Sequence, residues 1–440
     1  MASPERQPSV TRRVALVAVE MGYGHLRAAH ALAEELQAEV VEFDRPPFSS
    51  AGEARAVQRA RRAYEVLSRA SQARVVGAPL RLLLEALTFI PQLHPARDLS
   101  APTLGVSMLE RYARRGLGAA MLDRLHAEYA TLVTTFYAPA VLADCRGYPR
   151  IVCVVTDADV NRVWAPRHAA HSAVHYCSPS ERAARRLRAY GVPEDHVHLT
   201  GFPLPPGLVG GADLVTLRRN LAGRLVRLDS GGAFREQSRQ EIGHFVGALP
   251  AQEEGRPPLL TFAIGGAGAQ LRVARELLGA LAEPVRRGRL RLALVAGMRK
   301  PVAERLRRWA VEAGLESGPG SAVWVLYAES FSEYYRRFNA LLAETDILWT
   351  KPSELTFYAA LGIPLVLAPP VGVHERLNRR WARHRGAAFK QESPRLAWHW
   401  LREWLEDGTL AATAWAGYLR LPKFGSTRIA EVVAGVGKEA

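Results

Sequence analysis

A glycine-rich turn near the N-terminus, Glu20-Met-Gly-Tyr-Gly-His25, joins a short apolar segment to a helical pattern. Gly22 and Gly24 let the backbone come close to a ligand, and the helix start supplies free amides with partial positive charge. His25 stands at this helix start and is expected to point at the ligand. The same residues also fit a plain connector with a capping histidine, so the turn alone leaves both interpretations open.

A second turn of this kind, Ile264-Gly-Gly-Ala-Gly268, also follows an apolar segment and precedes a helical pattern. It lacks the Gly-Lys-Ser/Thr ending of a P-loop, and it does not complete a GxGxxG fingerprint. Its amides could still hold a diphosphate at the helix start. By itself this turn is weak evidence: phosphate contacts of Gly265, Gly266 and Gly268 are one interpretation, and a plain connector is the alternative.

Polar residues follow two later apolar segments, in Thr350-Lys-Pro-Ser-Glu-Leu-Thr356 and His374-Glu-Arg-Leu-Asn378. Ser353 is predicted to cap the next helix and Glu354 to favour its first turn, which accounts for both without a ligand. A ligand contact remains the alternative for these two residues. Three others have no such structural explanation and lie where ligand contacts are expected: Lys351, Glu375 and Asn378.

A carboxylate ends the apolar segment Val154-Val-Thr-Asp157, with Trp164 close behind it. Asp157 is a candidate general base because it is expected at the carboxyl end of a strand. The spacing Asp157-Ala-Asp159 also matches an Asp pair that binds metal. Two carboxylates alone are weak evidence for a metal site, and we expect none.

These residues sit in two successive blocks of alternating strand and helix patterns. The first block is predicted to contain strands at 13–19, 40–43, 131–135, 150–156, 173–177 and 196–200, and helices at 26–36 and 180–190. The second is predicted to contain strands at 259–264, 290–296, 323–327, 347–349 and 364–368. Such blocks form doubly wound parallel sheets, which bind ligands at the carboxyl ends of their strands.

The predicted organisation is an α/β fold with two Rossmann-like domains facing each other across a cleft. We place the N-terminal domain at 1–204 and the C-terminal domain at 258–421. The proline- and glycine-rich segment 205–257 is interpreted as an interdomain connection carrying two short helices. Residues 422–440 are predicted to form a last helix that could cross back to the first domain.

The chain has 440 residues and a formal net charge of +15, which favours polyanionic partners, although its bias toward arginine could also reflect genome composition. No apolar run approaches the length of a membrane span. Three cysteines without paired spacing favour reduced thiols and a cytosolic setting. Nucleic-acid binding is not expected, because the basic residues lack an interleaved aromatic or helix-turn-helix motif.

The segment 51–125 contains twelve arginines against six acidic residues. Within it, Leu80, Leu83, Leu84 and Leu87 share one predicted helical face. A basic helix with an apolar face suits the headgroup region of an anionic membrane. A helix packed on the core with a solvated basic face is the alternative.

Taken in order, these motifs resemble the GT-B glycosyltransferases of family 28. The similarity is greatest to the monogalactosyldiacylglycerol synthases and processive diacylglycerol glucosyltransferases, and it extends over most of the chain. Seven pieces carry it: Gly22-Tyr-Gly-His-Leu-Arg-Ala-Ala29, Val154-Val-Thr-Asp157 with Trp164, Tyr176-Cys-Ser-Pro-Ser-Glu181, Gly191 through Thr200-Gly-Phe-Pro203, Gly265-Gly-Ala-Gly268, Thr350-Lys351 with Leu361-Gly-Ile-Pro364, and His374 through Asn378.

The resemblance implies a nucleotide-sugar site in the C-terminal domain and a lipid-acceptor site in the N-terminal domain, with no metal and no cofactor. Gly265 to Gly268 would face the diphosphate, and Glu375 and Asn378 the donor sugar or ribose. His25 and Asp157 would be the catalytic candidates. Gly22, Gly24 and Trp164 would lie on the acceptor side, and Lys351, Ser353 and Glu354 on the donor side.

Three positions depart from the family pattern. Tyr23 replaces a glycine of the first turn, and His374 replaces a glutamine. Phe357 stands where a glutamate is expected, with Glu354 one turn earlier. These departures bear on which nucleotide and which sugar the chain would accept.

The sequence thus predicts a hexosyltransferase that uses a nucleoside-diphosphate sugar, most simply a UDP-sugar, and a lipid hydroxyl such as that of diacylglycerol. We expect it to be cytoplasmic and peripheral on the inner face of an anionic membrane. The alternatives are a GT-B sugar epimerase, a transferase with a soluble acceptor, or a non-catalytic module that binds nucleotide sugars.

Overall fold

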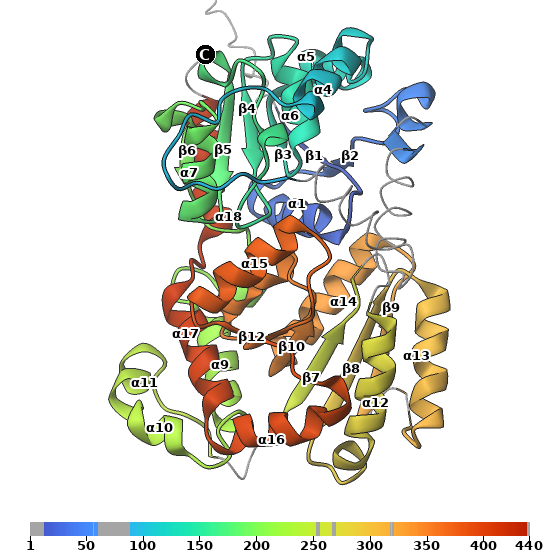
Figure 1. Cartoon of the computed structure of the whole chain (residues 1–440), viewed down its shortest axis with the longest axis vertical. Helices are drawn as coiled ribbons and strands as arrows, with labels where there is room; N and C mark the ends of the chain where they lie inside the picture. The colour runs from blue at the N-terminus through green and yellow to red at the C-terminus, as the bar shows by residue number, and fades with distance from the viewer. Residues whose placement is uncertain are drawn as a thin grey trace, which may run out of the picture.

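The computed structural model describes residues 13–55, 57–59, 89–251, 256–265, 270–316, 318 and 321–437, and these form two domains (Figure 1). Gly266, Gly268 and the predicted apolar face from Leu80 to Leu87 lie outside the described residues.

The N-terminal domain is built on a parallel sheet of six strands within the described residues, in the order β2-β1-β3-β4-β5-β6. The central strands are fully buried at residues such as Leu16, Val17 and Val152, which explains why they read as continuous apolar runs. Their bounds are β1 Arg13–Ala18, β2 Val40–Glu42, β3 Tyr129–Thr134, β4 Ile151–Val154, β5 Val174–Ser178 and β6 Val197–Leu199.

Helices connect the strands of this sheet and cover it. Ser180 accepts a hydrogen bond from the amide of Ala183 and so caps the helix that begins at Glu181. The α-helices are α1 Tyr23–Leu36, α4 Leu104–Arg114, α5 Ala119–Glu128, α6 Tyr137–Asp144 and α7 Glu181–Ala189. The short 3-10 helices are η1 Arg162–Trp164, η2 Ala169–His171 and η3 Glu194–His196.

The C-terminal domain repeats the plan, with strand order β12-β11-β10-β7-β8-β9 in its described part. Its strands are β7 Leu259–Ala263, β8 Arg291–Gly297, β9 Val323–Tyr327, β10 Ile347–Thr350, β11 Leu365–Leu367 and β12 Ala388–Lys390. Its layers include α12 Leu271–Arg286, α13 Lys300–Glu312, α14 Phe331–Glu344, the 3-10 helix η5 Glu354–Leu361, α15 Val373–His384, η6 Pro394–Leu396, α16 Ala397–Glu406 and α17 Thr409–Arg420. β12 was not predicted from the sequence.

The connecting segment holds four helices in its described part, so the prediction of two short helices is wrong. They are α8 Pro206–Val209, α9 Val215–Arg227, α10 Ala233–Gln237 and α11 Arg239–Phe245. Pro206 and Gly210 stand at the two ends of α8, and Gly232 directly precedes α10. α9 packs on the C-terminal domain, where the buried Arg224 donates to the carbonyls of Thr345 and Leu361 at 2.8 and 2.9 Å.

The last helix, α18 Gly425–Val436, packs against α1 and against strands β3, β4 and β5 of the N-terminal sheet. Figure 1 shows its red ribbon inside the upper domain. A Cβ at Gly425 would lie only 2.1 Å from the carbonyl oxygen of Phe202, so the helix approaches that backbone too closely for a side chain. The two chain segments that join the domains therefore lie close together.

Among the helices that the structure describes, none combines the length and the apolar character needed to cross a bilayer.

Asp346 is a buried charge that directly precedes β10. Its carboxylate is fully buried and accepts hydrogen bonds from Arg227, Arg256 and the amide of Leu259. Asp346→Ala would leave these donors without their acceptor. We expect it to lower the free energy of unfolding by about 3–5 kcal/mol, measured by urea denaturation followed by tryptophan fluorescence.

The control for that measurement is Glu283→Ala, which removes an exposed pair with Arg287. It is expected to cost less than about 1 kcal/mol. Equal shifts for the two variants would show that Asp346 does not stabilise the domain as a buried ion.

Candidate active site

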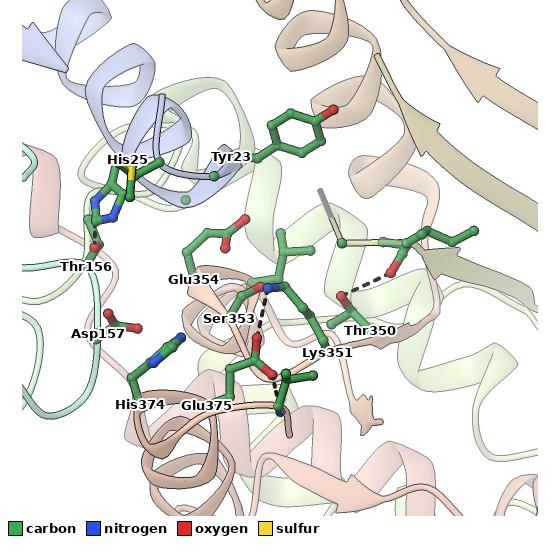
Figure 2. Close-up of a pocket in the computed structure, with 18 of the residues that line it drawn as sticks. Tyr23, His25, Thr156, Asp157, Thr350, Lys351, Ser353, Glu354, His374 and Glu375 are labelled. Carbon is green, nitrogen blue, oxygen red and sulfur yellow. Dashed lines mark hydrogen bonds and ion pairs between the residues drawn. The ribbon is translucent and has the colours of Figure 1, made fainter. Parts of the chain in front are cut away.

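A cavity of about 370 Å³ lies between the two domains, at the carboxyl ends of both parallel sheets. The N-terminal domain contributes the turn Glu20–His25 after β1, and Thr156 and Asp157 after β4. The C-terminal domain contributes the residues that follow β7, β8 and β10 and the start of α15. Figure 2 shows side chains from both domains pointing into this space. The first glycine turn and the start of the second, Ile264 and Gly265, are thus brought to one site.

His25 is held at the cavity wall by one ring N–H that is shared between two oxygen acceptors. Its Nδ1 lies 2.7 Å from the carbonyl oxygen of Thr135. The same nitrogen lies 3.1 Å from the hydroxyl of Thr156 (Figure 2). Because a carbonyl oxygen can only accept, Nδ1 carries the proton and Nε2 is the basic nitrogen of the neutral ring.

Burial lowers the pKa of His25 below its ordinary value of 6.5. The carboxylates of Asp157 and Glu354 and the Thr135 carbonyl oppose this effect, while His374 adds to it. A histidine with a lowered pKa is neutral at physiological pH and can accept a proton from a hydroxyl group.

Asp157 is held by a residue of the opposite domain. Nδ2 of Asn378 donates to Asp157 Oδ1 at 2.8 Å, and Oδ1 of Asn378 accepts from the amide of Ala158 at 2.7 Å. Asn378 is fully buried and stands outside the cavity wall, although it was expected to contact the donor. In this structure it positions the catalytic candidate and joins the two domains.

Lys351 and Glu375 form an ion pair on the C-terminal side of the cavity. Lys351 Nζ lies 2.8 Å from Glu375 Oε1, and the amide of Val371 donates to Glu375 Oε2 at 2.9 Å (Figure 2). Burial would raise the pKa of Glu375, but Lys351, His374 and these hydrogen bonds outweigh it and lower the pKa below its ordinary value. A positive charge is thereby held at the cavity by a buried carboxylate.

Gly265 is required beside that ion pair. A Cβ at this position would lie 2.7 Å from Cδ and from Cε of Lys351. The amide of Gly265 donates to Oε1 of Gln270 at 3.1 Å. Glycine therefore lets the lysine side chain pass the turn after β7 and reach the cavity.

The segment after β10 places Ser353 and Glu354 in the cavity wall. The prediction that Ser353 caps the next helix is wrong, because its side chain makes no capping bond and the helix is a 3-10 helix. There the amide of Thr356 bonds to the carbonyl oxygen of Ser353 instead. Glu354 packs against Gly24, where an added Cβ would lie 3.0 Å from the Oε2 atom of Glu354.

The departure at Phe357 has a structural explanation. Its ring stacks on Phe202, with centroids 4.9 Å apart and planes 8° apart, and it contacts Trp381. Phe357 is therefore part of the core, and Glu354 is the carboxylate of this segment that reaches the cavity.

The acceptor-side predictions fall into two groups. Gly22, with a φ of 115°, and Gly24 line the cavity. Trp164 is buried outside its wall, with a ring centroid 6.4 Å from that of His25.

Several wall residues and supports were missed by the sequence, chiefly Thr135, Thr156, Gln270, Met298 and Arg299. Thr156, which directly precedes Asp157, is the one that its position could have indicated.

The second carboxylate of the Asp157-Ala-Asp159 motif faces away from the cavity. Asp159 is buried and forms ion pairs with Arg186 at 2.8 Å and Arg182 at 2.6 Å. In the described part of the chain, no group of three or more His, Cys, Asp or Glu side chains has an arrangement suited to a metal ion.

No protein-family model matches the chain, and no curated protein matches its sequence. Solved structures match its fold. The UDP-GlcNAc 2-epimerase from Neisseria meningitidis bound to UDP-GlcNAc is 11% identical over 96% of this chain and 100% of that chain, with a TM-score of 0.51. MnaA of S. aureus with UDP is 11% identical over 97% and 96%, with a TM-score of 0.50.

A third structure, MurG of Acinetobacter baumannii, is 12% identical over 96% of this chain and 99% of that chain, with a TM-score of 0.49. The epimerase and MnaA establish the fold of this chain. It is the GT-B architecture predicted from the sequence, with two Rossmann-like domains facing each other across a cleft.

Glu375→Gln tests the buried ion pair. Because the pKa of Glu375 is lowered on folding, the ionised side chain stabilises the protein above its unfolded pKa of about 4.3. That contribution is lost as the pH falls through the lowered value. We expect wild type to exceed Glu375→Gln in melting temperature most clearly at neutral pH, and the gap to close on acidification.

The matched control is Glu283→Gln, which removes an exposed carboxylate from a surface pair. This substitution is expected to leave the decrease in melting temperature at acidic pH unchanged. A gap between wild type and Glu375→Gln that stays constant from neutral pH to about pH 3 would contradict the ion-pair assignment.

Proposed function

We propose that this chain is a hexosyltransferase that moves a sugar from a nucleoside diphosphate to a lipid hydroxyl. One observation carries the proposal: a neutral, partly buried His25 and the paired cation Lys351 occupy opposite domains of one cavity. The histidine side has the basic nitrogen that a hydroxyl acceptor needs. The lysine side has the positive charge and glycine turn that a diphosphate needs.

In the proposed reaction the acceptor O–H gives its proton to Nε2 of His25 as its oxygen bonds to the anomeric carbon. The bond from that carbon to the diphosphate oxygen breaks, and the diphosphate leaves with the electron pair. Asp157 stabilises the resulting imidazolium, since its charge already raises the pKa of His25. Lys351 and the amides at the start of α12 stabilise the leaving group. The proposal assigns no role to a metal or cofactor.

A uridine nucleotide is the proposed donor. Two solved structures of the same fold contain UDP and UDP-GlcNAc. Gly265, Lys351 and Glu375 stand where the strands of the C-terminal sheet end, which is the general ligand position of such sheets. We propose that Gly265 and its neighbours Gly266 and Gly268 face the diphosphate, with Ser353, Glu354 and Glu375 toward the sugar or ribose.

A lipid acceptor is supported by an apolar stripe on α4. Leu104, Met108 and Tyr112 follow one another at helical spacing and are 84%, 56% and 47% exposed. Exposed arginines at 111, 114 and 115 flank them. This combination suits an anionic headgroup region.

The position of α4 links that stripe to the cavity. α4 packs against η1, which carries Trp164, and Trp164 lies behind His25. A lipid held at α4 would enter the molecule from the side of the N-terminal domain. We therefore propose that the protein is peripheral on the inner, anionic face of a membrane.

A UDP-sugar epimerase is the second candidate. Asp157 and Glu354 both act on His25 from opposite domains, so acid and base groups stand on two sides of the cavity. An epimerase would convert the donor without an acceptor, whereas a transferase requires one.

The catalytic assignment is tested with labelled nucleotide sugars and liposomes that contain diacylglycerol. We expect His25→Ala and Asp157→Ala to lower kcat/KM by about 10²–10⁴-fold and 10–10³-fold respectively. In wild type the acid limb of the rate profile should lie below about pH 6.5, because the pKa of His25 is lowered.

His126→Ala is the matched control, since this histidine is exposed on α5 away from the cavity. Full activity in both His25 and Asp157 variants would refute the catalytic assignment. Absence of lipid product with every donor would refute the lipid transferase, and conversion of the donor sugar without acceptor would favour the epimerase.

The membrane proposal is tested by the triple variant Leu104→Ser/Met108→Ser/Tyr112→Ser. We expect it to lower the partition coefficient on vesicles with 30 mol% anionic lipid by roughly tenfold, because apolar contact area is lost. The measurement is vesicle sedimentation. Val311→Ser is the control, as Val311 is 69% exposed on α13. Equal binding of triple variant and wild type would exclude α4 as the membrane contact.

A further inference from the structure

Tyr23 reaches out of the N-terminal domain into a slot on the C-terminal domain. Its hydroxyl accepts a hydrogen bond from the amide of Met298 at 3.1 Å. Its ring centroid lies 5.9 Å from that of Phe331 and 5.0 Å from that of Tyr334, both on α14. Figure 2 shows the side chain extending away from His25 toward the other domain.

The slot depends on a glycine at the end of β8. Gly297 has a φ of +66°, and a Cβ there would lie 2.7 Å from Cε2 and 2.8 Å from the hydroxyl of Tyr23. The aromatic rings of α14, the backbone at Gly297 and the amide of Met298 form a slot that fits a planar ring with an acceptor oxygen. Tyr23 satisfies both requirements with its own ring and hydroxyl.

The slot also belongs to the cavity. Tyr23, Met298 and Tyr334 line it together with Gly265 and Lys351, the proposed phosphate contacts. Gly265, Met298 and Lys351 follow β7, β8 and β10, so they lie at one edge of the C-terminal sheet. A ligand with its diphosphate at Gly265 would therefore have its other end within the same space.

We propose that the slot is the binding place of the donor's nucleobase, and that Tyr23 competes with the base for it. The proposal rests on the proposed function, since it takes the donor to be a nucleoside diphosphate. A base such as uracil is planar and carries carbonyl oxygens that accept from an amide. Donor binding then requires Tyr23 to withdraw, and Tyr23 is two residues from His25 on the same turn. Entry of the base and movement of the catalytic turn are thereby coupled.

The experiment is calorimetric titration of the full chain with UDP and with pyrophosphate, which lacks a base. Tyr23→Ala is expected to lower the Kd for UDP by about tenfold, because a hydrogen bond and aromatic contacts no longer compete. Tyr23→Phe keeps the ring but loses the acceptor, so a decrease of roughly threefold is expected. Pyrophosphate should bind all three proteins equally.

His30→Ala is the matched control. His30 is on the same helix and contacts Phe331 and Tyr335 across the same domain interface, but it is not part of the cavity wall. It should leave the Kd for UDP unchanged. A comparable increase in UDP affinity in His30→Ala, or an increase in pyrophosphate affinity in Tyr23→Ala, would show that the domains open in general. Either result would overturn the proposal that Tyr23 competes with the base.

Unchanged or weaker UDP binding in Tyr23→Ala also overturns the inference, and weaker binding would make Tyr23 a ligand contact. Both results leave the proposed function standing, because wild type would still bind the nucleotide. If neither wild type nor any variant binds UDP, TDP, GDP or ADP, the proposed function fails, and the inference fails with it.

Discussion

Arg27 of α1 is buried against α14 and η5, and this contact sets how the two domains face each other. Its guanidinium carbon lies 4.6 Å from the ring centroid of Phe338 and 4.8 Å from that of Tyr358, and Nη2 donates to Asn339 at 3.1 Å. A buried charge needs such compensation, and all of it comes from the C-terminal domain. Nε and Nη1 are buried without hydrogen-bond partners, so the compensation is partial.

The cavity depends on this alignment because α1 also carries His25. Two further contacts hold the same domain arrangement: Asn378 donates to Asp157, and Glu354 packs against Gly24. Each involves a residue that lines the cavity or supports one that does. The site and the domain interface are therefore one structure, and a ligand that alters the interface through Tyr23 would also move the proposed base.

The polar residues of the site lie in two different electrostatic environments. In the Lys351–Glu375 pair both groups stay ionised without a ligand, whereas His25 is kept neutral by burial. Such opposite environments in one cavity suit a reaction that separates charge, with a proton taken on one side and a diphosphate released on the other. This contrast supports the proposed transferase chemistry more directly than any single motif.

The two parallel sheets, most of their strands and the first glycine turn could be predicted from the sequence, because continuous apolar runs and glycine positions reflect local geometry. The protonation and support of the site residues could not be predicted, because they depend on how the domains pack. The proton on His25 is set by Thr135 and Thr156, which lie 110 and 131 residues away along the chain. Asn378 supports Asp157 across 221 residues, and Tyr23 meets Met298 across 275. Such contacts cannot be predicted from residue spacing, since domain packing alone brings these segments together.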